Sequence, residues 1–156
     1  MVDGLSCFIC LVLNIILNME IDVEKIKSEC EKYGIISYKI NDDGSIDVFQ
    51  NVRMGYYSLI RIPLKFNFID GDLNLSGNNL VSLEGSPKIL TGSLSLLHNK
   101  NLKNLEHSPE EVGRMIHLRF SGIESLDGLK VPYSKLNGLS DRKMKLIRKH
   151  KLSNFI

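Results

Sequence analysis

The reactive side chains of this sequence are few and widely spaced. Cys7 and Cys10 form a C-x-x-C motif, a spacing that occurs in thiol–disulfide redox sites. The motif lies inside an apolar run with no βαβ pattern around it, so the sequence does not favour redox chemistry there. Cys30 makes the number of cysteines odd. Three cysteines cannot all pair within one chain, which argues against a disulfide framework and favours a reducing compartment.

The histidines form no metal-binding pattern. They are scattered over the second half of the chain, at His98, His107, His117 and His150. His98 directly follows a predicted strand, where ordinary packing or exposure explains a histidine without a metal. The sequence also contains no G-x-S-x-G motif, no P-loop and no H-E-x-x-H motif. We therefore expect no catalytic residue, no metal and no cofactor, and we predict that the protein is not an enzyme.

The length and composition are those of one globular domain. The chain has 156 residues, of which 43% are hydrophobic and 24% are charged, so wholesale disorder is not expected. The net charge of +2 is too small to imply a partner. Alanine is absent, whereas isoleucine, lysine and asparagine are plentiful. Because alanine codons are GC-rich and those of the other three are AT-rich, this composition indicates an AT-rich genome.

An apolar segment at residues 5–19 precedes the rest of the chain. It is shorter than the roughly 20 residues that a membrane-spanning helix needs, and it lacks the positive start and cleavage site of a secretory signal. Three interpretations stay open: a buried helix, a short membrane-surface anchor, or translated upstream sequence ahead of a native start at Met19. We favour the last, because an amphipathic pattern begins just after Met19. We predict a cytoplasmic protein, with membrane association through residues 5–19 as the alternative.

A four-unit repeat organises the middle of the chain. The units begin at Val52, Leu73, Leu94 and Ile116, with periods of 21, 21 and 22 residues, and self-similarity at such a period is typical of solenoids. Each unit approximates L-x-L-x-x-N-x-L-x-x-L. Prolines recur behind the units, at positions 63, 87, 109 and 132. The segments 84–92 and 106–114 carry proline and glycine, and we expect turns or a single helical turn there rather than full helices.

The repeat pattern has a physical explanation. L-x-L predicts a very short strand whose two leucines face the interior, because side chains alternate across a strand. The chain then turns away from the sheet and leaves backbone groups that need hydrogen-bond partners. The amides of Asn78 and Asn99 can both donate and accept, so we predict that these two residues form a structural ladder. Tyr57 and Ser121 occupy the same position in the two end units, where the ladder is expected to be incomplete.

This pattern resembles the leucine-rich-repeat family over roughly 46–130. The tails "SLEGSPK" and "NLEHSPEEVG" are similar to those of compact repeat proteins of bacteriophages and AT-rich bacteria. The resemblance implies a solenoid of the α/β class with short parallel strands on its concave face. It also implies a protein-binding function, such as that of a phage or bacterial factor acting on a host protein. Some members attach a catalytic domain with a cysteine nucleophile, but no cysteine follows Cys30 here.

The segments that flank the repeat have features of caps, which a solenoid needs to cover its apolar ends. Residues 21–34 predict a helix with Asp22 as its N-cap and Gly34 as its C-terminal stop. Residues 35–52 predict a hairpin whose turn contains Asp43 and Gly44. The predicted organisation is an apolar segment at 1–19, an N-terminal cap of helix and hairpin at 20–51, four repeats at 52–132 and a C-terminal basic cap helix at 133–156.

The predicted C-terminal helix, at 140–155 with its start at Ser140 or Asp141, is strongly basic. A basic helix can bind phosphates or an anionic membrane surface. It can also be a solvated cap whose long side chains cover apolar surface. We favour the cap, because the whole chain is nearly neutral and no aromatic residue is interleaved for stacking on bases. Nucleic-acid or anionic-surface binding is the alternative function, carried by Arg142, Lys143, Lys145, Arg148, Lys149 and Lys151.

We predict a monomer that binds a protein partner on the concave face of the strands. In the predicted register the outward residues are Asn51, Arg53 and Gly55, then Asp72, Asn74 and Ser76, then Ser93, Ser95 and Leu97, and finally Met115, His117 and Arg119. All of them except Asn51 and Gly55 are predicted to contact the partner. The centre is predicted at Leu97, His117 and Arg119, because an arginine beside exposed apolar groups is common at the core of protein interfaces.

Overall fold

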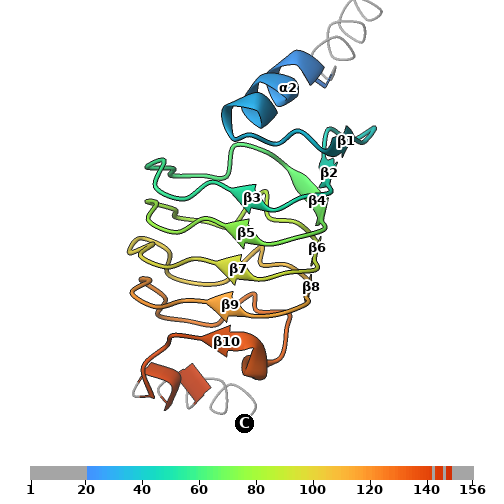
Figure 1. Ribbon diagram of the computed structural model, residues 1–156. Coiled ribbons are helices and arrows are strands. Elements are labelled where there is room, and N and C mark those ends of the chain that lie inside the picture. Colours follow the sequence, from blue (N-terminus) through green and yellow to red (C-terminus); the bar gives the residue numbers. More distant parts are fainter. Residues whose placement is uncertain (1–20, 142, 146, 149–156) are drawn as a thin grey trace, which may run out of the picture.

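The computed structural model describes residues 21–141, 143–145 and 147–148. The chain winds into a solenoid of stacked coils, in which parallel strands form two separate sheets (Figure 1). The predicted apolar segment with its C-x-x-C motif lies outside the described residues, as does part of the predicted C-terminal helix. Within the part of the chain that the structure describes, no helix is long and apolar enough to cross a membrane.

The first sheet contains the strands that the repeat predicted. They are β3 (Val52–Arg53), β5 (Leu73–Asn74), β7 (Leu94–Ser95), β9 (Ile116–His117) and β10 (Leu136–Asn137). All neighbouring pairs are parallel, and the first residues of the five strands are in register. The repeat alignment ended before β10, because Leu136 is followed by Gly138 instead of a second leucine. We call this sheet the repeat sheet.

The second sheet was not predicted beyond its hairpin. It contains β1 (Tyr38–Ile40), β2 (Ile46–Val48), β4 (Phe66–Ile69), β6 (Ile89–Leu90) and β8 (Glu111–Val112). The hairpin strands β1 and β2 are antiparallel, as expected, and β2 pairs in parallel with β4. The expectation of only turns or a helical turn at 84–92 and 106–114 was wrong for β6 and β8. Each of these strands has two residues and buries one side chain, Leu90 or Val112. Two residues are too few to show the alternation by which a strand is recognised in a sequence.

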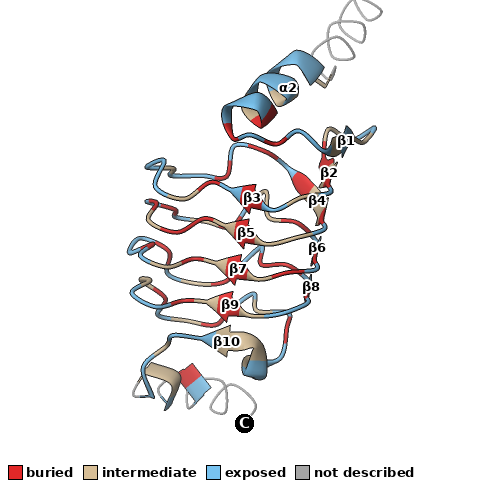
Figure 2. Cartoon of the chain, in the orientation of Figure 1, coloured by how far each residue is buried: buried red, intermediate tan, exposed pale blue. Residues whose placement is uncertain are grey.

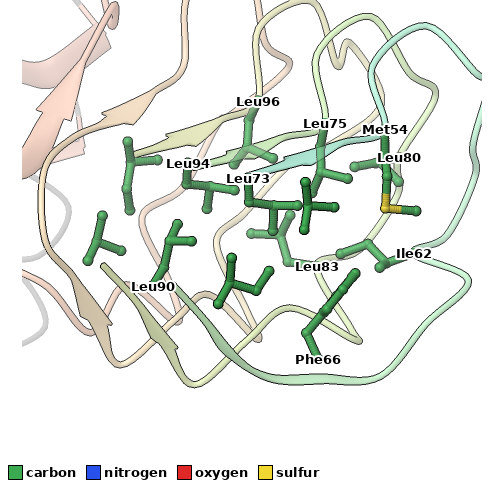
Figure 3. Close-up of a cluster of buried hydrophobic side chains, with 14 of the residues drawn as sticks. Met54, Ile62, Phe66, Leu73, Leu75, Leu80, Leu83, Leu90, Leu94 and Leu96 are labelled. Atoms are coloured by element: carbon green, nitrogen blue, oxygen red, sulfur yellow. The ribbon is translucent and has the colours of Figure 1, made fainter. Parts of the chain in front are cut away.

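The core lies between the two sheets. Figure 3 shows that Leu73, Leu75, Leu94 and Leu96 of the repeat sheet project inward, on the side where Leu90 lies. All five side chains are fully buried, and Figure 2 shows buried residues on successive strands of the stack. Each coil therefore buries its apolar side chains against the coils on either side, since a single coil cannot enclose a core alone.

The helix predicted near the N-terminus is present as α2 (Val23–Lys32). The side chain of Asp22 accepts a hydrogen bond from the backbone N–H of Lys25 at 2.9 Å, which satisfies one of the free donors of the first turn. Gly34 follows the helix with a φ of 64°. Cys30 and Tyr33 are buried in the same cluster as the side chains of the coils, and α2 lies at the β1 end of the stack (Figure 1).

The other end of the stack contains a 3₁₀ turn, η1 (Tyr133–Lys135), directly before β10. Residues 141, 143–145 and 147–148 are helical, at the place where the sequence predicted the start of a helix. Ile147 is buried and belongs to the core cluster. The remaining residues of the predicted C-terminal helix lie outside the described part of the chain.

The buried asparagine amides connect three successive coils. Asn78 donates to the carbonyls of Met54 and Leu75 at 2.7 and 2.9 Å, and its side-chain oxygen accepts from the backbone N–H groups of Tyr57 and Leu59 at 3.0 and 3.1 Å. The side chains of Asn78 and Asn99 are both buried. Their hydrogen bonds therefore replace the hydration that the buried backbone groups have lost.

Asn99 repeats the arrangement one coil further along. It donates to the carbonyls of Leu75 and Leu96 at 2.9 and 3.2 Å and accepts from the N–H of Leu80 at 3.3 Å. In the last unit the Ser121 hydroxyl donates to the Leu118 carbonyl at 2.7 Å. A hydroxyl can donate only one hydrogen bond, so Ser121 satisfies its own coil and does not connect to the preceding one.

We expect Asn78→Ala to lower the free energy of unfolding by roughly 1–3 kcal/mol, because the backbone groups of Met54, Tyr57 and Leu59 would lose their partner, whereas the Leu75 carbonyl would keep its bond from Asn99. The control is Asn137→Ala, since Asn137 is an exposed asparagine on β10 and a surface substitution there should change stability by less than about 0.5 kcal/mol. Chemical denaturation of both variants measures the difference. Equal midpoints would remove the amide ladder from this account of the fold.

The coils approach each other closely where the chain enters the repeat sheet. A Cβ atom added to Gly113 would lie 1.9 Å from the backbone carbonyl oxygen of Thr91 in the preceding coil. We expect Gly113→Ala to cost about 3 kcal/mol of stability, the upper range for overpacking, because backbone must move. Gly34→Ala serves as the control. The added Cβ atom has no neighbour within 4 Å, so the only expected loss of stability is about 1 kcal/mol from the left-handed backbone. Thermal unfolding in which Gly113→Ala is the milder change would contradict the close approach.

Candidate functional site

The outward face of the repeat sheet contains most of the residues that were predicted to bind a partner. Strand pairing aligns Arg53, Asn74, Ser95 and His117 in one column across the coils. Arg53 is exposed and the other three are half-buried. The middle side chains of this column, Asn74 and Ser95, are short and polar, and the larger Arg53 and His117 stand on either side of them.

Ser76 is a correction to the predicted face. The register pointed it outward, but only 4% of Ser76 is exposed. Its hydroxyl oxygen lies 2.7 Å from that of Ser95, and its backbone N–H donates to the side-chain oxygen of Asn74 at 2.9 Å. A hydroxymethyl group is too short to extend past these neighbours, so Ser76 joins two coils and does not offer a contact surface.

Asp72 also has a structural role that the sequence interpretation missed. The Asn51 side-chain oxygen accepts from the backbone N–H of Asp72, and Asp72 accepts from the backbone N–H of Ser93, both at 2.7 Å. Each of these residues directly precedes a strand of the repeat sheet, and together they form a second polar ladder. The recurrence of a small polar residue directly before β3, β5 and β7 was a signal for it. The last bond of this ladder is the one that the backbone N–H of Ser93 donates to Asp72.

The predicted centre of the face lies at its β7–β9 end. Leu97, Met115 and His117 are half-buried, and Arg119 is exposed. The Arg119 guanidinium carbon lies 4.7 Å from the centroid of the Phe120 ring, within the range of a cation–π contact. Leu97 and Met115 were expected to be exposed; each is partly covered but still contributes accessible apolar surface.

An aromatic pair beside this centre was not predicted. The rings of His98 and Phe120 stack, with centroids 4.8 Å apart and an interplanar angle of 28°. Both residues are exposed. Arg119, Phe120 and His98 thus form a continuous stack of flat groups that runs from the face of the sheet onto its edge.

These rings belong to a column of left-handed backbone positions. Tyr56, Gly77, His98 and Phe120 each stand four residues after the start of a strand, with φ angles of 64°, 67°, 60° and 60°. At this position the chain leaves the repeat sheet, and the N–H groups of Tyr56, Gly77 and His98 donate to the next coil. We call the exposed rings of Tyr56, His98 and Phe120 the aromatic edge.

Glycine is the residue that adopts such a backbone without penalty, and Gly77 occupies the position in the second coil. For other residues, and above all for bulky ones, a positive φ is unusual and costs roughly 1–2 kcal/mol. Tyr56 and Phe120 are 75% and 57% exposed, so burial of their rings does not offset this cost. The rings therefore stand where folding alone would favour glycine.

Two open pockets lie along the aromatic edge. The first lies among Tyr56, His98, Lys100 and the amide side chains of Asn79 and Asn101. The second is lined by Arg119, Phe120 and Lys143, the last from the helical residues after β10. Among the described residues, neither lining contains an aspartate or glutamate. The pockets thus combine flat rings with cationic and amide groups.

The electrostatics near the second pocket follow from burial and from one ion pair. Burial lowers the pKa of the Lys143 amine below its usual range; Glu124 opposes this shift, and Lys103 adds to it. Glu124 itself pairs with Lys103 at 2.6 Å, which lowers the pKa of its carboxyl group. Both partners of this pair are largely solvated, so it neutralises Glu124 locally and adds little to stability.

Other candidate sites are weaker. Within residues 21–141, 143–145 and 147–148, no group of three histidine, cysteine or acidic residues is placed to hold a metal ion. A larger open pocket lies on the return arcs that lead to the second sheet, with Ile62, Leu64 and Phe66 among its lining. Its cations include Lys130, which already pairs with Glu110 at 2.9 Å. His107 lines this pocket and His150 lies outside the described residues.

Against the models of known protein families, curated proteins and solved structures, the chain finds no match. The architecture therefore rests on the sequence repeat together with the stacked parallel strands. The functional assignment rests on the face of the repeat sheet and on the aromatic edge beside it.

We expect Phe120→Gly to leave the melting temperature unchanged or to raise it. The substitution relieves the left-handed strain, which offsets the loss of an exposed ring contact worth less than about 1 kcal/mol. The matched control is Phe49→Gly, because Phe49 is similarly exposed, at 52%, but has a negative φ. Glycine there should destabilise by about 1 kcal/mol. Thermal unfolding in which Phe120→Gly is the more harmful change would show that the ring is needed for folding.

Proposed function

We propose that the chain is a leucine-rich-repeat solenoid that binds a partner protein on the outward face of the repeat sheet and catalyses no reaction. Support comes from the four-unit repeat, from the buried asparagines at the repeat positions and from the outward face that the coils present. The tails behind the repeats are similar to those of phage and bacterial repeat proteins. The partner we propose is accordingly a host protein.

The observation that carries this proposal is the composition of the β7–β9 end of the face. Leu97 and Met115 present accessible apolar surface beside His117 and Arg119. The core does not account for the two apolar side chains, because the same coils already bury Leu94, Leu96, Ile116 and Leu118 almost completely. Apolar side chains next to an arginine, surrounded by a polar rim, make the usual core of a protein interface.

The shape of the face also favours a protein over a small ligand. Small-molecule sites are concave and enclose most of the ligand. The outward face of the repeat sheet instead carries short side chains at its centre, Asn74, Ser93 and Ser95. The partner would therefore meet a broad surface of modest relief whose strongest anchors lie at one end.

The test is affinity capture from cells of the source, followed by mass spectrometry and by measurement of the affinity for the recovered partner. We expect the double substitution Leu97→Ser, Met115→Ser to weaken binding by at least about tenfold, since truncating interface anchors costs more than about 1.4 kcal/mol. The melting temperature should change little, because both side chains are already partly exposed.

The control is the double substitution Val81→Ser, Ile89→Ser, which removes exposed apolar groups from other surfaces of the coils; Val81 and Ile89 are 51% and 39% exposed. This variant should bind the partner as the unaltered protein does. If the control loses affinity while the Leu97, Met115 variant retains it, the binding face has been assigned to the wrong side of the solenoid.

A further inference from the structure

The aromatic edge brings together two features that lie far apart in the sequence. Tyr56, His98 and Phe120 come from different coils, whereas Lys143 follows β10. The second pocket nevertheless places Lys143 with Phe120 and Arg119. The basic residues near the C-terminus have no aromatic residue interleaved among them in the sequence, and the solenoid places the Phe120 ring beside one of these cations, Lys143.

The rings are placed at a cost to the fold. Gly77 shows that a glycine meets the backbone requirement at this position, and Tyr56 and Phe120 meet it only with strain. Exposed residues held in strained conformations are characteristic of binding sites, where the surrounding structure maintains them for contact with a ligand. Three of the four equivalent positions carry such a ring, which points to a ligand with several flat groups in sequence.

The charge of the edge narrows the chemistry of that ligand. Lys100, Arg119 and Lys143 line the two pockets without an acidic residue among the described lining. Glu124, which acts on Lys143 electrostatically, is engaged with Lys103. An anionic ligand therefore complements the edge. Asn79 and Asn101 add amide groups that can donate to and accept from the edges of unpaired bases.

We propose that the aromatic edge binds single-stranded nucleic acid, with bases stacked in the first pocket on Tyr56 and His98, with the Phe120 ring supporting His98 from behind, and with phosphates held by Lys100, Arg119 and Lys143. Rings that stack bases together with cations that follow the backbone are the two components of single-strand binding sites. A duplex buries the faces of its bases, so it cannot use the rings. This proposal concerns the edge, which shares Arg119 with the face of the repeat sheet and otherwise uses different residues.

The experiment measures fluorescence anisotropy of labelled oligouridylate and oligothymidylate of about 12 nucleotides, a length within the range of single-strand sites. The full chain is titrated over a range of salt concentrations. With three phosphate contacts, the plot of log affinity against log salt should have a slope of about −2. A duplex of the same length should bind at least about tenfold more weakly.

The decisive variants are Phe120→Gly and His98→Gly, because glycine removes a ring at a left-handed position without threatening the fold. His98→Gly should weaken binding roughly tenfold, as expected for the loss of one stacked base, and Phe120→Gly should weaken it by a smaller factor, because it removes the support of the His98 ring. Phe120→Tyr keeps a ring and should restore affinity. Phe49→Ser removes a ring of similar exposure on another surface and should have no effect. Lys100→Ala should reduce the steepness of the salt slope by about 0.7.

Any of the following results would overturn the proposal. The first is no binding of either oligonucleotide at low salt. The second is unchanged affinity after Phe120→Gly or His98→Gly. Another is equal affinity for a flexible polyanion without bases, such as polyphosphate. In either case charge alone would explain the binding. The last is loss of the captured protein partner in the glycine variants without oligonucleotide binding, which would assign the edge to the protein interface.

Discussion

The structure depends on hydrogen bonds between successive coils. A coil of about twenty residues cannot satisfy its own backbone groups, because its strands are only two to four residues long and pair only with the coils above and below. Where the strands end, Asn78 and Asn99 extend this pairing into the turns. The spacing of the coils is thereby set by backbone hydrogen bonds, and the leucines fill the space that this spacing leaves.

This constraint determines what the surface can display. Residues at equivalent positions of successive coils are brought side by side, so a column of side chains has a fixed spacing and direction. The close approach of Thr91 to Gly113 shows how little freedom the backbone has between coils. Along such a column, one coil can carry a residue that the backbone conformation favours, and another coil can carry an exposed side chain at the equivalent position. The left-handed column does both, with Gly77 in one coil and Phe120 in another.

The face and the edge of the repeat sheet meet at Arg119. Its side chain extends from the sheet and its guanidinium group lies over the Phe120 ring, so it belongs to both surfaces. The two proposals remain separable because their other residues differ: the face is apolar at Leu97 and Met115, whereas the edge combines rings with Lys100 and Lys143. Hydrophobic anchoring and stacking with charge pairing respond differently to salt, which provides a physical distinction between them.

The sequence by itself determined the features that local chemistry repeats. The L-x-L pairs predicted the strands β3, β5, β7 and β9, Asp22 and Gly34 predicted the bounds of α2, and Asp43 with Gly44 predicted the hairpin. Asn78 and Asn99 were recognised because an amide at a fixed place after a strand has one clear use. Each of these predictions needed only side-chain periodicity or a turn residue close by in the chain.

Only the tertiary structure decided the rest, because it depends on contacts between coils. β6 and β8 are strands by virtue of pairing with their neighbours, and their two residues contain no periodicity. Ser76 is buried by Ser95 and Asn74 around it, although the alternation of side chains points it outward. The left-handed backbone at Phe120 and its proximity to Lys143 arise from the path of the chain out of the sheet. Hydrogen bonds and packing between segments some twenty residues apart set these features, and no local sequence pattern encodes them.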